Sequence, residues 1–277
     1  MKQFMRNRWF AALFGLAGFL MLCWCGPNSS AKDESPRRMP EDDRQVVREY
    51  LGRDVVGDAV ASPVLPGGVN DILTLRDGIV WHMRVISGKD AGNDQLSSSA
   101  SIHPSDGSRE FRFDTGDGEG FLFTRLDAKG SLWCFASQDN QVGVISRYSP
   151  PQPIFLADLK PGETRHIASH VSVADLSQPQ IETHSGNLEI DFTYVGAYRV
   201  KVPAGNFDAM LLKTHLKGHV GPASVDDSVY RFIARNGGLV AVVETDEVSA
   251  FLVYQDHTRM GKVLWKRCDG PRNHSEP

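Results

Sequence analysis

The sequence has few cysteines, no complete catalytic signature and only one long uncharged run. Four cysteines occur among 277 residues, and two of them lie within the first 25. No G-x-S-x-G nucleophile turn, P-loop or dinucleotide-binding glycine motif is present, so the common signatures of hydrolases and nucleotide-binding enzymes are lacking. No second apolar run is long enough to span a membrane. The sequence therefore predicts no catalytic residues, no metal and no cofactor.

Basic residues are also scarce beyond the N-terminal region. The chain has 30 Lys and Arg against 34 Asp and Glu, and residues 1–31 hold three of the cations and none of the acids, which leaves 27 against 34, a net charge of −7. Nucleic-acid phosphates require clustered Lys and Arg for affinity. An acidic chain without a basic stripe therefore predicts no nucleic-acid partner.

The uncharged run from Trp9 to Cys25 follows three cations, which is typical of a secretory signal. Ser29-Ser30-Ala31 supplies small residues for a cleavage site. Residues 1–31 are thus a cleaved signal peptide, a segment lipidated at Cys23 or Cys25, or a retained membrane helix. All three alternatives predict an exported protein of the periplasm or outer cell envelope, which meets the membrane only through this segment.

The remaining chain divides into a tether, a domain and a tail. Residues 32–40 are rich in charge and proline and predict a disordered tether, and residues 269–277 form a polar tail. Acids in the first turn and the stop at Gly52 predict a short helix over 41–51. It opens a β-rich domain over 41–268, within the size range of a single all-β fold.

Short alternating runs rich in Val, Ile, Phe and Thr predict antiparallel strands through most of this domain. The turn signals between them recur at the spacing of a sandwich or barrel. The predicted strands are 72–75, 79–86, 111–113, 121–123, 132–136, 142–148, 167–173, 188–195, 210–216, 229–234, 239–245 and 248–254.

Two segments resemble each other across the middle of the chain. Residues 75–83 and 159–167 both read apolar, basic, turn, Gly, three variable positions, His, apolar. The shared pattern predicts turn glycines at Gly78 and Gly162, each leading into a strand. It also suggests two similar halves meeting near residue 150.

Three stretches resemble a group of exported bacterial β proteins and lipoproteins of unknown function. They are LTLRDGIVWHMRV (73–85), similar to L-P-L-x-x-G-x-x-W-x-Y; YRVKVPAGNFDAMLLKT (198–214), which contains V-P-A-G-x-F-x-A; and YRFIARNGGLVAVV (230–243). The resemblance implies a mostly β protein, an antiparallel half-barrel like the lipoprotein carriers, with a sandwich as the alternative. The second motif itself predicts a hairpin in which Pro203 ends one strand, Gly205 or Asn206 turns the chain and Phe207 re-enters the core.

Cys134 and Cys268 are the remaining cysteines, an even pair in an oxidising compartment. They are either a disulfide, which would close a long loop, or two separate buried thiols.

The histidine pairs 166/170 and 215/219 have the H-x-x-x-H spacing of zinc helices, but they fall in predicted strands. Four strand residues span about 13 Å, too far for two ligands of one zinc ion, so solvent-facing histidines are predicted. The loop DTGDGEG (114–120) contains one aspartic-protease triplet where that chemistry needs two. Its carboxylates at Asp114, Asp117 and Glu119 lack the ligand order of calcium loops, and an exposed hairpin loop is predicted.

Trp81, Trp133 and Phe207 are the candidate ligand-binding residues, because a half-barrel has one concave apolar face that a lipid, a hydrophobic small molecule or a partner must cover. The helix at 41–51 is a candidate lid. The preferred hypothesis is a non-enzymatic envelope protein that binds such a ligand or an envelope protein. The alternatives are an exported hydrolase or metal-dependent enzyme, and an anchored structural module without a ligand.

Overall fold

The computed structural model describes residues 36–268 apart from positions 64, 66–67, 72–79, 103, 105, 116–117, 236 and 251–253. The predictions for residues 1–31, including Cys23 and Cys25, for the tail 269–277 and for the turn at Gly78 therefore lie outside the described residues. Of the predicted tether, residues 36–40 are described, and they form neither helix nor strand.

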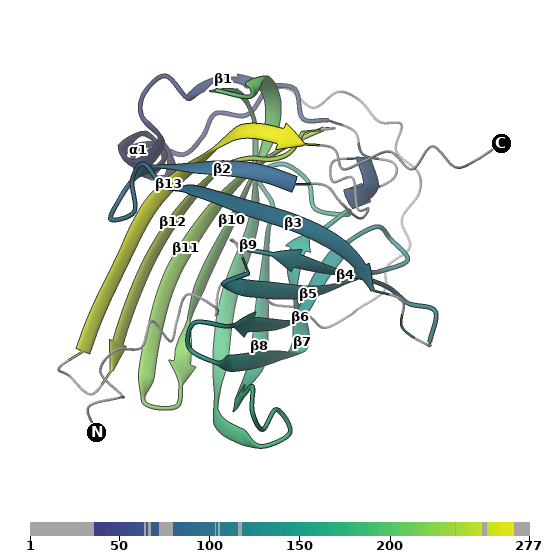
Figure 1. Cartoon of the computed structure of the whole chain (residues 1–277). Coiled ribbons are helices and arrows are strands. Elements are labelled where there is room, and N and C mark those ends of the chain that lie inside the picture. Colours follow the sequence, from purple (N-terminus) through teal and green to yellow (C-terminus); the bar gives the residue numbers. More distant parts are fainter. Residues whose placement is uncertain are drawn as a thin grey trace.

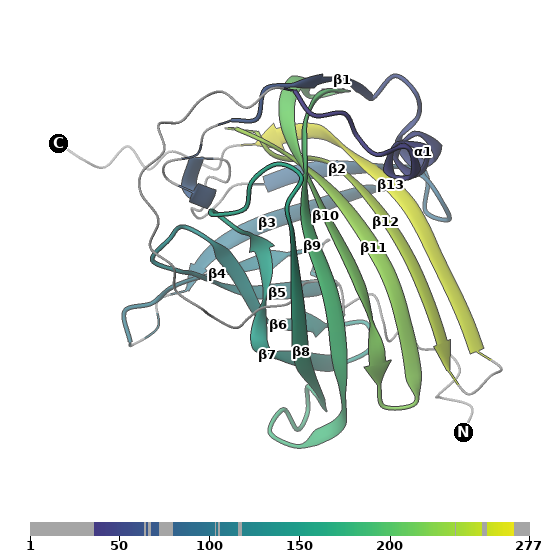
Figure 2. The same ribbon diagram turned by 180° about the vertical axis from the view of Figure 1, so that it is seen from behind.

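Twelve antiparallel strands form a closed barrel. Each strand from β2 to β13 pairs with the next along the chain, β13 pairs back with β2, and β8 pairs with β9. Figures 1 and 2 show the long strands β9 to β13 as one wall and the shorter strands β3 to β7 facing it. The strands are β2 (Val80–Ser87), β3 (Asp94–Ile102), β4 (Arg109–Asp114), β5 (Gly120–Leu126), β6 (Leu132–Asp139), β7 (Val144–Phe155), β8 (Thr164–Asp175), β9 (Glu182–Val202), β10 (Gly205–Val220), β11 (Ala223–Ala234), β12 (Gly238–Ala250) and β13 (Tyr254–Cys268).

The mostly antiparallel β class is confirmed, while the half-barrel and sandwich alternatives are corrected to a closed barrel. Most predicted strands lie within or overlap observed ones, and the strand predicted at 72–75 lies outside the described residues. The strand predicted at 248–254 is wrong, because β12 continues to Ala250 and β13 begins at Tyr254. The suggested boundary near residue 150 falls inside β7, which pairs with both β6 and β8.

Side chains on the two faces of the barrel wall enter two different apolar clusters. On β10, Met210, Leu212 and Leu216 point inward and join residues of β4, β6, β7 and β8 in the first core cluster. The alternate residues Ala209 and Leu211 belong to the second cluster, which includes the helix. Because successive strand residues point to opposite faces, the second cluster extends onto the outer surface of this wall.

The N-terminal strap, residues 36–60, covers that outer apolar surface. Its helix α1 (Glu41–Leu51) has the predicted bounds and ends at Gly52, whose N–H donates to Arg48 O at 3.0 Å. Val47 and Leu51 are buried in the second cluster, and α1 contacts β12, β13 and β2. Strand β1 (Val56–Val60) then pairs with the C-terminal part of β9.

The helix lies beside the upper ends of β12 and β13 (Figure 1). The predicted lid over a concave inner face is therefore wrong, since α1 packs on the outside of the wall. Within the described residues, no helix is long and apolar enough to span a bilayer.

Two predicted turns are present as backbone features. Val202 pairs with Gly205 across the Pro203-Ala204 turn, so the V-P-A-G motif is the β9–β10 hairpin, and Gly205 has a φ of +138°. Gly162 has a φ of +84° just before β8, and its N–H donates to Tyr194 O at 2.5 Å. Both positions require the conformational freedom of glycine.

Candidate functional site

A group of charged residues projects into the barrel from β11, β12 and β13. On β11 these residues alternate with outward side chains and share the inward face with Val225 and Ile233 of the first core cluster. The pairing of β11 with β12 carries the same face onto the next strand. The charged cluster consists of Asp227, Arg231, Glu244, Asp246 and Lys262.

Arg231 is a half-buried residue of β11 on the inward face of the wall. Its guanidinium donates to Thr214 Oγ1 at 3.1 Å. Its charge partly opposes the rise that burial causes in the pKa of the Cys134 thiol, which lies on β6 in the facing wall. Burial lowers the pKa of Arg231, while the carboxylates of Glu244 and Asp227 oppose that shift. A buried guanidinium requires such partners, because an unpaired charge in an apolar interior is strongly unfavourable.

The charged cluster contains one close ion pair and one pair of adjacent aspartates. Lys262 Nζ lies 3.1 Å from Glu244 Oε2, and the two side chains are 14% and 26% exposed. Asp227 and Asp246 are 3% and 8% exposed and face each other directly in the β11–β12 register. Burial, followed by the charge and hydrogen bond of Asp246, raises the pKa of Asp227 well above its usual range.

The predicted solvent-facing histidines are confirmed on the outer wall. His166 Nδ1 lies 2.5 Å from Asp191 Oδ1, and His215 Nε2 lies 3.0 Å from Asp226 Oδ1. His170 and His219 are exposed on the same face. In the part of the chain that the structure describes, no group of three or more His, Cys, Asp or Glu side chains is arranged to hold a metal ion. The wall thus presents paired charges to water.

The three candidate ligand-binding aromatics lie in different surroundings. Trp81 is buried in the second cluster on β2, and Phe207 is half-buried against the same cluster. Trp133 instead packs against the first cluster, and its indole N–H donates to Asp127 Oδ2 at 2.8 Å. The structure therefore does not gather them around one ligand.

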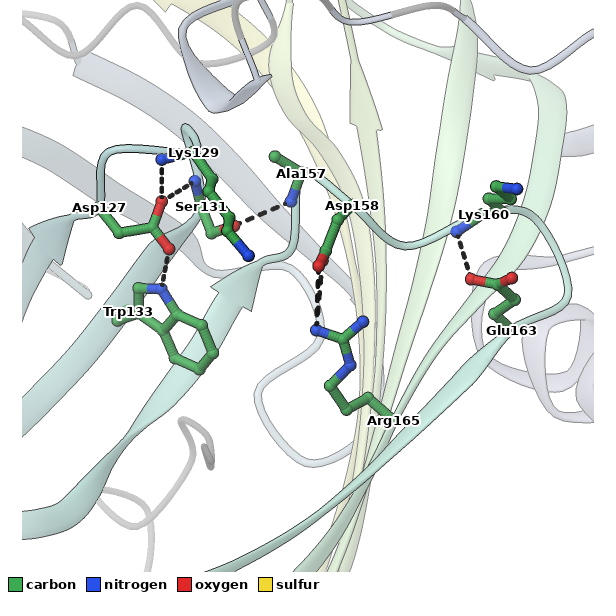
Figure 3. A network of polar contacts seen from close by, with 9 residues as sticks. All are labelled: Asp127, Lys129, Ser131, Trp133, Ala157, Asp158, Lys160, Glu163 and Arg165. Carbon is green, nitrogen blue, oxygen red and sulfur yellow. Dashed lines mark hydrogen bonds and ion pairs between the residues drawn. The ribbon is translucent and has the colours of Figure 1, made fainter. Parts of the chain in front are cut away.

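Figure 3 shows why Trp133 has a structural role in the turn between β5 and β6. Asp127 Oδ1 accepts hydrogen bonds from the backbone N–H groups of Lys129 and Ser131, at 2.8 and 2.9 Å, while its other oxygen accepts from Trp133. Ser131 Oγ in turn accepts from the Ala157 N–H at 3.1 Å. One carboxylate thereby fixes the turn and the orientation of the indole.

Of the two alternatives left open for the cysteines, the structure shows Cys134 as a free, buried thiol that donates to Ala136 O at 3.1 Å. Burial raises the pKa of this thiol to about 12. Cys134 faces the barrel interior on β6, whereas Cys268 ends β13, and its side chain lies outside the described residues. The alternative of a separate buried thiol holds for Cys134.

The loop after β4 is described only in part. Asp114 Oδ1 accepts a hydrogen bond from the Gly118 N–H at 3.0 Å, which is a turn contact. Asp117 lies outside the described residues, so the candidate calcium ligands are not all placed.

Sequence reasoning missed the charged cluster, although one signal was present. On β11, Asp227 and Arg231 have the same parity as the apolar residues Val225, Val229 and Ile233. Charged residues in phase with the apolar face of a strand point into the core.

No family model matches the sequence, and no curated protein matches it either. Three solved structures are similar to the chain. One is a candidate lipoprotein from Parabacteroides distasonis, with 13% identity over 70% of this chain and 96% of the other and a TM-score of 0.36. Another is a candidate exported protein with a YmcC-like fold from Bacteroides fragilis, with 12% identity, 70% and 96% coverage and a TM-score of 0.38. The third is the hypothetical lipoprotein YmcC from Escherichia coli, with 9% identity, 73% and 92% coverage and a TM-score of 0.37.

Proposed function

We propose that this chain is an exported, non-enzymatic β-barrel protein of the bacterial cell envelope that acts by binding. Export is supported by the three cations and the uncharged run within residues 1–31. The resemblance of residues 73–85, 198–214 and 230–243 to exported β proteins and lipoproteins supports the same assignment. The N-terminal segment, cleaved, lipidated or retained, is the only part of the chain proposed to meet the membrane.

Binding rather than catalysis is supported by the separation of the acid–base groups. The histidines lie on the outer face of β8 and β10, whereas the cluster carboxylates lie on the inner face of β11 and β12. General acid–base catalysis needs its groups within about 3 Å of a common substrate. The sheet between the two sets keeps these histidines and the interior carboxylates from acting on one substrate.

The chemistry of the interior supports an amphipathic ligand. The first core cluster gives the inner wall a large apolar surface, while Arg231 and Lys262 place two cations beside it. Ligand sites typically combine apolar lining with a few placed polar groups. This juxtaposition is the observation that carries the proposal, and a lipid with an anionic head group is the favoured class. An envelope protein bound on the outer surface is the second candidate, favoured by the polar outer wall.

Native mass spectrometry of the full-length protein purified from envelopes tests the proposal. A co-purified lipid in stoichiometric amount supports it, and stoichiometric zinc or calcium would favour the metal-dependent enzyme instead. Protein that carries neither would favour an anchored module without a ligand.

Variants then locate the ligand. Lys262→Met should reduce lipid occupancy without unfolding the barrel, because it removes one of the two cations and keeps an unbranched side chain of similar length. Trp81→Ala should also reduce it, whereas Trp265→Ala, at an exposed position of β13, is the matched control. If Trp81→Ala only unfolds the protein, Trp81 belongs to the core.

A further inference from the structure

Two buried aspartates face each other inside the barrel. If both were ionised, their negative charges would repel each other. Asp227 of β11 and Asp246 of β12 are directly paired in register, and both side chains are buried. Like charges directly opposite on neighbouring strands are destabilising even at a surface. In a low-dielectric interior the repulsion is stronger, so one carboxyl of such a pair retains a proton.

The surrounding cations do not balance the negative charge that the cluster would carry with all its carboxyl groups ionised. The charged cluster contains three carboxyl groups and two cations, Arg231 and Lys262, and Lys262 is paired with Glu244. On β10 the residues opposite Arg231, Val229 and Asp227 are Leu212, Thr214 and Leu216, which carry no charge. Across the barrel, burial raises the pKa of both Cys134 and Tyr148, so these groups are neutral. The charged cluster as the structure describes it therefore holds one more carboxyl group than cations.

We propose that Asp227 and Asp246 share a single proton and form a proton-binding site inside the barrel, which links barrel stability to pH. The shared proton lets one carboxyl donate to the other and leaves the pair with one negative charge, so that this charge and Glu244 balance the two cations. This site is independent of the proposed ligand, since it needs only the register and burial of the pair.

The direction of the linkage follows from the raised pKa of Asp227. The folded chain holds the proton more tightly than the unfolded chain, whose aspartates titrate at about pH 3.9. The contribution is fully present below that pH and is lost as pH rises through the folded pKa. The stability of the barrel should therefore fall with increasing pH over this window.

Urea denaturation of the full-length protein between about pH 5 and about pH 9 tests the linkage. In this pH range the folded wild type holds one proton that its unfolded chain has lost, whereas folded Asp227→Asn holds no such proton. The ratio of the two unfolding constants should therefore change about tenfold per pH unit. Asp208→Asn is the control, because Asp208 is an exposed aspartate on β10 whose partner is Arg199, a side chain that stays charged throughout this pH range. Its pH profile should keep the wild-type slope in this window. Equal slopes for Asp227→Asn and wild type would overturn the proposal.

Infrared spectroscopy provides a second readout that needs no unfolding. Folded wild type at neutral pH should show the carbonyl band of one protonated carboxyl, which Asp208→Asn retains and which Asp246→Asn or Asp227→Asn loses or shifts. Absence of that band in wild type would also refute the shared proton, whether or not the variants fold.

Discussion

The residues beside a buried carboxyl group decide whether it is ionised or holds a proton. Asp43 of α1 is almost fully buried, yet two donors reach its Oδ1 atom: Lys213 Nζ at 2.5 Å and the Tyr230 hydroxyl at 3.0 Å. Asp227 is equally buried, but its direct neighbour is another acid. The first carboxylate ties the strap to the barrel wall, and the second holds a proton in our proposal.

Asp43→Ala should lower the free energy of unfolding by about 2–4 kcal/mol, because it leaves a buried tyrosine hydroxyl and a partly buried ammonium without their acceptor. Asp42→Ala is the control, since Asp42 is exposed in the same first turn, and it should change stability by about 0.5 kcal/mol or less. Urea denaturation measures both. Equal effects of the two substitutions would show that the contacts of Asp43 do not stabilise the fold.

Cys134 should resist alkylation in the folded protein, because burial both excludes the reagent and raises the pKa of its thiol to about 12. Iodoacetamide treatment near neutral pH followed by peptide mass mapping should leave Cys134 unmodified, while the same treatment in denaturant should modify it. A peptide linked through Cys134 and Cys268 would contradict the free thiol.

Individual site residues were the hardest feature to predict from the sequence. The turn roles of Gly162 and Gly205 follow from local backbone requirements and could be predicted. The partner of Trp133 could not, because Asp127 reaches it only after the turn between β5 and β6 has formed. The inward direction of Asp227 was hidden because a charged residue within a strand is normally assigned to the solvent face.

Among the elements, α1 was predicted with its observed bounds, because acids in its first turn and Gly52 at its end are local signals. Strand β3 was missed because its sequence, DQLSSSASI, is rich in serine and has no regular alternation of apolar and polar residues. Strand β13 was missed for a related reason: its charges lie between apolar residues, and its strand character comes from pairing with both β12 and β2.

The packing of the strap against the wall should depend on Gly261 of β13. A Cβ at this position would collide with the backbone oxygen of Tyr50 at the end of α1. Gly261→Ala should displace the end of the helix and expose residues 36–60 to limited proteolysis. Gly57→Ala is the control, since its Cβ would lie 3.6 Å from Arg199 O, an ordinary contact. Equal protease resistance of the two variants would show that α1 does not rest on β13.

At the scale of the molecule, closure of the barrel decides which residues lie inside. The periodicity of single strands predicts which residues share a face, but not which strands far apart in sequence pair with each other. The β13–β2 and β8–β9 pairings close the ring and place the charged cluster within it. The half-barrel prediction lacked this long-range information, and so it placed an open binding face and a lid where the molecule has a closed barrel and an outer strap.

Backbone NOE measurements on the deuterated protein test this closure most directly. We predict contacts between β13 and β2, including Val263 with Arg84, and between β8 and β9, including Ile167 with Ile190, in one spectrum. Contacts along β8–β9 without any between β13 and β2 would indicate an open half-barrel, and they would contradict the enclosed charged cluster on which the proposals depend.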